Sequence, residues 1–216
     1  MSLFHVLIFF LFNKIKDGLC INNITFNNLM LTEHNKYRKI HKVPNLILDN
    51  NLIRTAMAYA ESLAKRPNNN LEPSYIYQGD DKLGENLFQC NKEGCSINNG
   101  IESVEYWYNE IQNYSFESNG GEGVDNFTQI VWKNTKKLGC GIAQKRENNY
   151  KVVCHYYPSG NVLGEYKYNV LPPINISKNN NSDNSDSSKG NMTYEEYIAY
   201  SFFIKINLMV FLILFL

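Results

Sequence analysis

The stretch VDNFTQIVWKNTKKLGCG, residues 124–141, sets three consecutive apolar residues, Ile130, Val131 and Trp132, between polar side chains. The apolar residues have the character of a buried segment, whereas the polar residues around them could line a pocket. The stretch is therefore either the wall of an active site or a scaffold around a pocket without chemistry. The side chain at position 126, an asparagine, decides between these two interpretations.

Strands follow Trp132 and helices precede this stretch. The segments LGCGIAQ from Leu138 and YKVVCHYYP from Tyr150 are rich in β-forming residues, and the polar residues 145–149 between them predict a hairpin. Apolar residues at helical spacing predict helices over residues 30–40, 50–66 and 99–114. Helices on either side of a small antiparallel sheet give an α+β domain of three layers.

Length and charge limit the possible classes of protein. The chain has 216 residues, and without its two apolar ends roughly 150 remain for folding, which is enough for one domain with one core. Its 21 basic and 21 acidic residues give a formal net charge of zero, so the sequence offers no basic face for nucleic acid. Nucleic acid is therefore excluded as a partner.

The two ends differ in composition from the body of the chain. Residues 3–12, LFHVLIFFLF, have the length of the apolar region of a signal peptide, which predicts a signal over residues 1–20 and secretion. The folded domain is predicted over residues 21–173, followed by a disordered tether rich in asparagine and serine over residues 174–192. Residues 193–216 end in an apolar run that suits either a glycolipid-anchor signal or a transmembrane segment. A buried C-terminal helix is the less favoured alternative, because the tether precedes it.

Cysteine usage agrees with an extracellular protein. Once Cys20 leaves with the signal, four cysteines remain, an even number as a disulfide framework requires: Cys90, Cys95, Cys140 and Cys154. Of the possible connectivities we favour Cys90 with Cys95, which closes a short loop, and Cys140 with Cys154, which joins neighbouring strands. A zinc site is disfavoured, because paired CxxC spacings and nearby histidines are missing.

Sequons for N-glycosylation suit the same compartment. The chain is so rich in asparagine that several of these matches arise by chance. The candidate glycosylation sites are Asn23, Asn113, Asn175, Asn180 and Asn191, and a further sequon begins at Asn126.

Five motifs in register resemble one family. The segments HNKYRKIHKVPNLILDNNL, GENLF, WYNEIQNYSF, DNFTQIVWKNTKKLGCG and VVCHYYPSGNV occur in the order seen in the CAP superfamily of cysteine-rich secretory, antigen 5 and pathogenesis-related proteins. The resemblance covers about residues 29–172, and a narrower likeness is to the venom-allergen-like proteins of parasitic worms. It implies an α-β-α sandwich with a small central antiparallel sheet. It also implies a central cleft where, in many members, two histidines and two glutamates hold a divalent metal.

The resemblance places Glu85 of GENL and Glu110 of WYNEI at the two acidic positions of that cleft, but both histidines are missing. Asn126 stands in DNFTQ where the family has GHFTQ, and Glu72 lies in the segment where the first histidine belongs. Carboxylates without imidazole disfavour zinc and would hold a hard ion such as calcium only weakly. We therefore expect no metal or other cofactor. We expect Glu85 and Glu110 to accept hydrogen bonds from backbone amides and from Asn126.

Catalysis is disfavoured for the same reason, because acyl transfer needs a nucleophile beside a general base of suitable pKa. The four histidines have structural interpretations: His5 lies in the signal, His34 and His41 flank the first helix, and His155 lies in a strand. The sequence thus predicts a protein that is not an enzyme, and the opening stretch is interpreted as scaffold.

Binding is the favoured function. Family members bind sterols or fatty acids, so the resemblance implies a lipid site near an aromatic loop before DNFTQ. Tyr108, Tyr114 and Phe116 are the candidate lipid-binding residues, although Tyr108 at helical spacing beside Trp107 also suits a core position. The alternative is a surface glycoprotein that meets a protein receptor in host interaction or immune modulation. Either protein would be extracellular, and it would be held at the membrane through its C-terminal tail.

Overall fold

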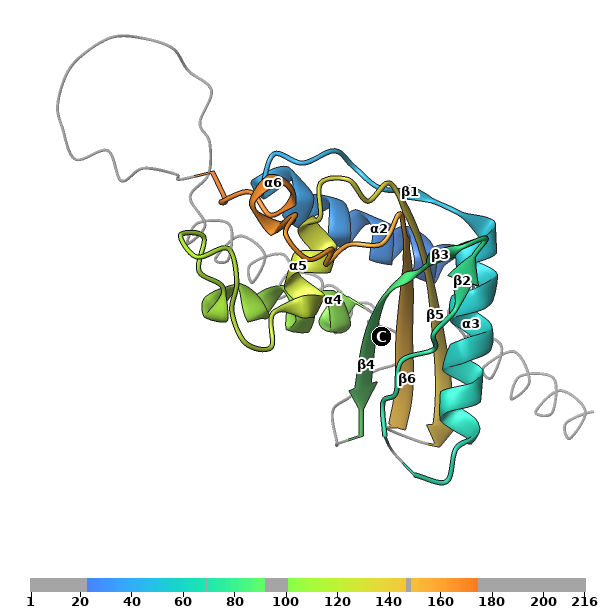
Figure 1. Ribbon diagram of the computed structural model, residues 1–216. Coiled ribbons are helices and arrows are strands. Elements are labelled where there is room, and N and C mark those ends of the chain that lie inside the picture. Colours follow the sequence, from blue (N-terminus) through green and yellow to red (C-terminus); the bar gives the residue numbers. More distant parts are fainter. Residues whose placement is uncertain (1–22, 69, 92–100, 147–148, 175–216) are drawn as a thin grey trace, which may run out of the picture. The chain divides into compact units, whose positions relative to one another are not determined.

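A four-stranded sheet lies at the centre of the computed structural model, which describes residues 23–68, 70–91, 101–146 and 149–174 (Figure 1). Across the sheet the strands are β1 (Ile47–Leu48), β5 (Lys137–Arg146), β6 (Asn149–Tyr157) and β4 (Gly84–Cys90). The pairs β5–β6 and β6–β4 are antiparallel, whereas β1 runs parallel to β5. A separate hairpin consists of β2 (Tyr77–Gln78) and β3 (Asp81–Lys82).

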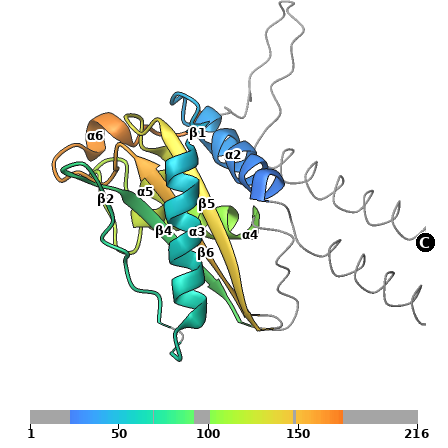
Figure 2. The same ribbon diagram turned by 90° about the vertical axis from the view of Figure 1, so that its right-hand side faces the viewer.

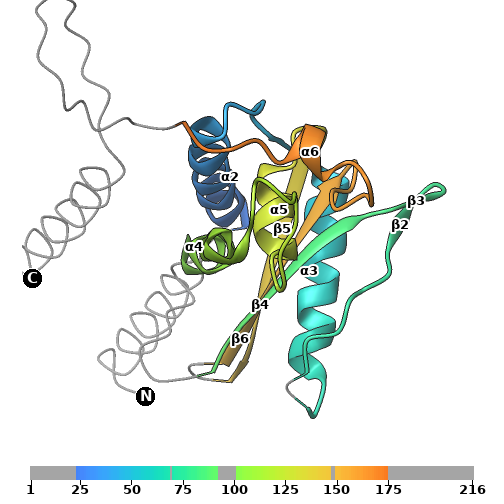
Figure 3. The same cartoon turned by 60° about the vertical axis from the view of Figure 1, so that its left-hand side comes forward.

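Helices cover both faces of this sheet. Helix α3 (Asn50–Lys65) lies along one face, as Figure 2 shows. The other face carries α2 (Asn23–Ile40), α4 (Ile101–Tyr108) and α5 (Asp125–Val131), so that the sheet lies between two helical layers (Figure 3). The 3-10 helix η1 (Asn109–Asn113) follows α4, and the short helix α6 (Tyr166–Asn169) follows the sheet. The predicted three-layer α-β-α fold is confirmed.

The predicted helices and hairpin are present, but some of their ends differ. Helix α2 begins at Asn23 rather than near Met30, because Phe26 and Met30, four residues apart, are both fully buried. Helix α3 is capped by Asp49, whose carboxylate accepts hydrogen bonds from the first backbone amides of the helix at 2.9 and 3.2 Å. The sequence analysis missed strand β4, since Glu85 and neighbouring polar residues interrupt its apolar pattern.

The strand register decides which side chains face each helical layer. Gly139, His155 and Glu85 lie opposite one another on three neighbouring strands and therefore share one face of the sheet. The same face contains Val153, which packs with three residues of α3: Ala56, Ala60 and Leu63. The larger core cluster lies on the other face and includes Phe26, Trp107, Phe127, Trp132 and Tyr156.

Two glycines of β5 allow α3 to approach the sheet closely. A Cβ atom at Gly139 would lie 2.1 Å from the backbone nitrogen of Ile53, and one at Gly141 would lie 2.4 Å from the Cα atom of Met57. These neighbours are backbone atoms of the helix, which cannot rotate away as a side chain can. Glycine at both positions therefore sets the distance between α3 and the sheet.

A disulfide joins Cys140 and Cys154, which lie directly opposite each other on β5 and β6. This pairing confirms the predicted bridge between Cys140 and Cys154. In the chain-entropy model a bridge over a loop of about 15 residues stabilises the folded state by about 3 kcal/mol. Cys90 is also disulfide-bonded, whereas the partner predicted for it, Cys95, lies outside the described residues.

A buried arginine ties the layers on the α2 side together. Arg38 of α2 is fully buried, and its guanidinium donates hydrogen bonds to four backbone carbonyls. These carbonyls belong to Pro44 at 2.7 Å, Ile130 at 2.8 Å, Trp132 at 2.8 Å and Thr135 at 3.0 Å. This one side chain thereby holds the loop after α2 against the end of α5. It also donates to backbone carbonyl oxygens that lie outside the hydrogen-bond pattern of the sheet.

The predicted terminal segments lie almost entirely outside the described residues. This applies to the signal at residues 1–20, the tether at residues 174–192 apart from Ile174, and the anchor at residues 193–216. The first of two compact units of the chain ends at Pro173. Within the described part of the chain, every helix is too short or too polar to cross a membrane.

Candidate binding cleft

Glu110 of η1 organises the start of α5. Its carboxylate accepts hydrogen bonds from the backbone nitrogen of Asn126 at 2.9 Å, from the Asn126 side-chain amide at 2.6 Å and from the backbone nitrogen of Phe127 at 3.0 Å. First-turn amides of a helix have no partner within the helix, so a carboxylate placed there satisfies them. These contacts are the hydrogen bonds expected for Glu110.

Glu85 lies on the α3 face of the sheet and has its own set of partners. Its Oε1 atom accepts a hydrogen bond from the backbone nitrogen of Ser74 at 2.9 Å, and its Oε2 atom lies 3.0 Å from Nε2 of His155. His155 Nδ1 in turn lies 2.9 Å from the hydroxyl of Thr55 on α3. The His155 side chain is fully buried and that of Glu85 is 11% exposed.

The pKa of Glu85 reflects these partners. Burial alone would raise this pKa, but the hydrogen bonds from His155 and Ser74 outweigh burial, so the pKa lies below its ordinary value. Glu85 is therefore a carboxylate at neutral pH. The sequence analysis assigned His155 only to a strand and missed this contact. The strand register carries the signal that was missed. Cys154 bonds to Cys140 on the α2 side of the sheet, and successive side chains of a strand alternate, so His155 must face α3.

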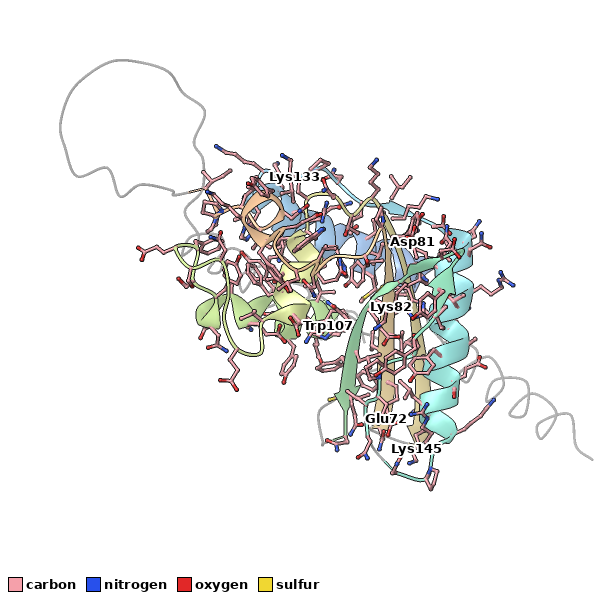
Figure 4. All side chains as sticks on the ribbon, viewed as in Figure 1. Glu72, Asp81, Lys82, Trp107, Lys133 and Lys145 are labelled. Atoms are coloured by element: carbon pink, nitrogen blue, oxygen red, sulfur yellow. A yellow bond between two sulfur atoms is a disulfide. The ribbon has the colours of Figure 1, made fainter. Side chains whose placement is uncertain are left out.

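Glu72, the third acidic candidate, points elsewhere. Its carboxylate pairs with Arg66 at 3.0 Å and is 60% exposed, and its backbone carbonyl accepts a hydrogen bond from Tyr59 at 2.5 Å. Figure 4 shows Glu72 near Lys145 at the end of the molecule where α3 ends. The expectation that Glu72 lies beside the other cleft residues is thus corrected, because its carboxylate pairs with Arg66 at the surface.

The candidate lipid-binding residues are largely buried. Tyr108 is 3% and Tyr114 is 7% exposed, whereas Phe116 is partly buried. Tyr108 stacks on Tyr37 with ring centroids 3.8 Å apart, which is the core packing that we gave as its alternative. Tyr114 packs edge-to-face against Phe116 and Phe127, at 4.9 and 5.6 Å between ring centroids. Among the described residues, the buried Tyr114 hydroxyl finds no hydrogen-bond partner.

A concave region, which the sequence analysis missed, lies between the β2–β3 hairpin and the loop after β6. This groove has a volume of about 470 Å³. Its charged lining residues are Asp81, Lys82, Lys136 and Glu165, and Trp132 and Val162 contribute apolar surface. No sequence motif marks this region, because its walls come from segments far apart in the chain.

The sequons differ in their surroundings. Asn23 and Asn113 are exposed, whereas Asn126 holds its side-chain amide against Glu110. Asn175, Asn180 and Asn191 lie outside the described residues. The structure therefore leaves the Asn113 amide accessible in the folded domain, next to the aromatic loop.

The fold is thus a three-layer sandwich domain with two hydrogen-bonded glutamates. Glu85 lies on the central sheet, and Glu110 lies in η1 after α4. The chain belongs to the CAP family, described as the cysteine-rich secretory protein family, whose model matches residues 31–156. The resemblance seen in the sequence motifs is thereby confirmed.

Relatives and solved structures extend this assignment. The Golgi-associated plant pathogenesis-related protein 1 of Homo sapiens is 40% identical over 151 residues, which cover 68% of this chain and 94% of that protein. Secreted protein RBT4 of Candida albicans is 32% identical over 148 residues, covering 67% of this chain and 38% of that protein. The solved structure of BmVAL-1 shares the fold, with a TM-score of 0.53 and 24% identity over 64% of this chain and 79% of that one.

The metal implied by the family does not fit the residues of this chain. Both oxygens of Glu110 accept hydrogen bonds from the start of α5, and both oxygens of Glu85 face Ser74 or His155. Across residues 23–174, as far as the structure describes them, no three His, Cys, Asp or Glu side chains lie together where they could hold a metal ion. A stable zinc site needs at least three such protein ligands.

Proposed function

We propose that this CAP domain is a non-catalytic, extracellular binding module that takes a sterol or another lipid beneath the loop of residues 114–124. The observation that supports this proposal is the unpartnered, buried hydroxyl of Tyr114 within an aromatic cluster. A buried hydroxyl without a partner costs about 1–3 kcal/mol, which a ligand hydroxyl placed beside it would recover. Aromatic rings such as those of Phe116 and Phe127 would pack against the flat ring system of a sterol.

The loop over this cluster is built as a small closed unit. Ser115 and Gly120 exchange two backbone hydrogen bonds, at 2.9 and 3.2 Å. The chain then turns at Gly123, which has a φ of 64°. In our proposal this unit moves outward as a whole to admit the lipid and carries Phe116 with it.

The absence of catalysis is part of the proposal. The hydroxyl of Thr55 lies 2.9 Å from Nδ1 of His155. It donates to the carbonyl of Leu52 in its own helix at 3.1 Å. A nucleophile must instead be free to reach a substrate carbonyl while its base takes its proton. We therefore assign Thr55 and His155 to structure.

Replacement of Tyr114 by phenylalanine tests the lipid site, because it removes only the hydroxyl. We expect the full-length protein to bind radiolabelled cholesterol saturably. We expect Tyr114→Phe to weaken binding about tenfold, which corresponds to one hydrogen bond of about 1.4 kcal/mol. The control is Tyr168→Phe, since the Tyr168 side chain is 69% exposed; it should leave the affinity unchanged.

A second candidate function is that of a surface glycoprotein that engages a protein receptor. The groove of about 470 Å³ favours it, because exposed apolar side chains lie beside it. Tyr75 is 64%, Tyr77 58% and Leu163 94% exposed, which is unusual for a lone soluble domain. If the folded protein binds neither cholesterol nor a fatty acid, the lipid proposal fails and this second candidate takes its place.

Attachment to the cell surface through residues 193–216 remains part of the proposed function. Expression on intact cells followed by a phosphatidylinositol-specific phospholipase tests it. Release of the protein into the medium is expected for a glycolipid anchor. A protein that stays on the cells and keeps a C-terminal tag has a transmembrane anchor instead, and a protein found only in the medium before treatment contradicts anchoring altogether.

A further inference from the structure

An exposed leucine lies at the tip of the loop that follows β6. The backbone nitrogen of Glu165 donates to the carbonyl of Val162 at 3.0 Å, and Gly164 has a φ of 86°. This is the pattern of a type II turn, which needs a positive φ at its third residue. The second residue of the turn is Leu163, and its side chain is 94% exposed. Turns favour small or polar residues, so a leucine held out into solvent needs an explanation of its own.

Other apolar side chains are exposed beside Leu163. Val162 is 41% exposed, and Tyr168 on α6 is 69% exposed. The helix is tied to the turn, because the backbone nitrogen of Tyr168 donates to the carbonyl of Glu165 at 3.1 Å. A single exposed apolar residue is normal on a protein surface, whereas a group of them marks a contact surface.

Four exposed lysines come from the segments around this apolar tip: Lys42, Lys133, Lys136 and Lys167. Lys167 belongs to α6, and the backbone nitrogen of Lys133 donates to the carbonyl of Asn169, the last residue of α6, at 3.0 Å. Figures 1 and 4 place Lys133 beside α6. Lys136 lines the same groove as Val162. The apolar tip therefore has ammonium groups in its surroundings.

The loop after α2 brings Lys42 to the same end of the domain. His41 precedes it, and Nδ1 of His41 lies 2.6 Å from the carbonyl oxygen of Leu171, two residues after α6. Two carboxylates, those of Glu165 and Asp125, also lie near α6, so the lysines outnumber them by four to two. In the part of the chain that the structure describes, none of the four lysines forms an ion pair.

We propose that the three apolar residues and the four lysines, here called the α6 face, dock on the surface of a phospholipid bilayer. Val162 and Leu163 enter the boundary between headgroups and acyl chains, and Tyr168 lies at the level of the headgroups. The ammonium groups bind phosphate oxygens and are attracted to anionic lipids. This docking is independent of the proposed sterol site beneath residues 114–124.

The end of the folded unit supports a membrane as the occupant. The first compact unit of the chain ends at Pro173, and the contact between His41 and Leu171 keeps its last residues at the α6 face. An anchor in residues 193–216, which is part of the proposed function, would raise the local concentration of lipid at this face. The docking itself does not require that anchor.

The competing occupant is a protein receptor, the second candidate function. The centre of a protein interface is depleted of charged residues, and such interfaces favour arginine over lysine. Here every basic side chain of the α6 face is a lysine, and the apolar part protrudes as a turn. A protruding apolar tip among lysines matches the layered chemistry of a bilayer surface, with phosphates outside and acyl chains beneath.

Leu163→Trp in the full-length protein reports the docking directly. The two natural tryptophans, Trp107 and Trp132, are buried, so a quencher in the lipid reaches chiefly the new indole. The probe consists of vesicles of brominated phosphatidylcholine and phosphatidylserine. We expect quenched and blue-shifted fluorescence, and weaker quenching when phosphatidylserine is left out.

Tyr106→Trp is the matched control, because Tyr106 is a 62% exposed aromatic residue on α4. Its ring packs against Phe88, which pairs with Val152 of β6. The α6 end of β6 is Tyr157, whose carbonyl accepts a hydrogen bond from the backbone nitrogen of Lys136. Five residues of strand, about 17 Å, separate the two positions, so lipid at the α6 face should not quench this indole.

Neutral variants test the lysines. In the Leu163→Trp protein, Lys133→Gln and Lys167→Gln should each lower the ratio of docked to undocked tip about fivefold. Lys65→Gln removes an exposed lysine from the last turn of α3, beside Lys145 near the far end of β5, and should leave this ratio unchanged.

A Leu163→Trp fluorescence that stays unquenched with phosphatidylserine present would overturn the inference and leave the α6 face to a protein receptor. Equal quenching with and without phosphatidylserine, or equal ratios for Lys167→Gln and Lys65→Gln, would overturn the role of the lysines. The cholesterol affinity of Tyr114→Phe is measured without vesicles. A failure of the docking is therefore distinguishable from a failure of the proposed sterol site.

Discussion

Replacement of Arg38 by methionine should lower the free energy of unfolding by about 4 kcal/mol. The methionine fills much of the same volume, but four carbonyl oxygens lose the guanidinium as a donor at once, and of these the Trp132 carbonyl keeps the backbone nitrogen of Thr135 at 3.2 Å. Each unsatisfied buried acceptor costs about 1–3 kcal/mol, and removal of the buried charge offsets part of this sum. Burial lowers the pKa of Arg38 to about 10, so the side chain is still protonated at neutral pH. Urea denaturation followed by circular dichroism measures the difference.

Two further variants make the Arg38 result specific. Arg38→Lys keeps the charge but has one nitrogen in place of a planar fork, so it should lose about half as much stability as Arg38→Met. Arg54→Met removes an exposed arginine of α3 and should change stability by less than about 0.5 kcal/mol. A loss below about 1 kcal/mol for Arg38→Met would show that the four carbonyls find other partners, and the proposed role of Arg38 would then be wrong.

The second large effect is expected for Gly141→Ala. The new methyl group would lie 2.4 Å from both the nitrogen and the Cα atom of Met57, and a real Cβ atom is essentially never so close. Helix α3 must then move away from the sheet and give up contacts along its length. Overpacking of this kind costs about 3 kcal/mol, which lowers the melting temperature of a domain of this size by about 10 °C. Differential scanning fluorimetry measures this shift.

Gly120→Ala is the matched control for Gly141→Ala. A Cβ atom at Gly120 meets nothing within 4 Å, so the same change of chemistry should leave the melting temperature nearly unchanged. If Gly141→Ala is as stable as Gly120→Ala, the close approach of α3 to β5 is not a determinant of the fold.

The sequence predicts the layers of this fold well because their signals are local. The apolar spacing of α3 and the hairpin of β5 and β6 depend on residues close together in the chain. The start of α2 was less predictable, since its first three residues, Asn23, Ile24 and Thr25, are exposed and its buried positions begin with Phe26 and Asn27. Packing of buried residues such as Phe26 and Met30, more than helix propensity, stabilises this part of the helix.

The candidate site was predicted only in part, because some of its contacts join residues that are far apart in the chain. Glu85 and Glu110 could be found from motifs, and the hydrogen bonds of Glu110 to the start of α5 were expected. The contact between His155 and Glu85 joins residues 70 positions apart and follows only from the pairing of β4 with β6. The groove beside Lys82 likewise depends on how the hairpin lies against a later loop. Such features require the three-dimensional arrangement.

The bond between Glu110 and the Asn126 amide has a consequence for biogenesis. Asn126, Phe127 and Thr128 form a sequon, and the nitrogen that would carry the sugar is the one held 2.6 Å from Glu110. If the chain enters a secretory compartment, as we propose, oligosaccharide transfer to Asn126 competes there with formation of this hydrogen bond. In the folded domain this nitrogen is held against Glu110, so a sugar must be added before α5 packs against η1.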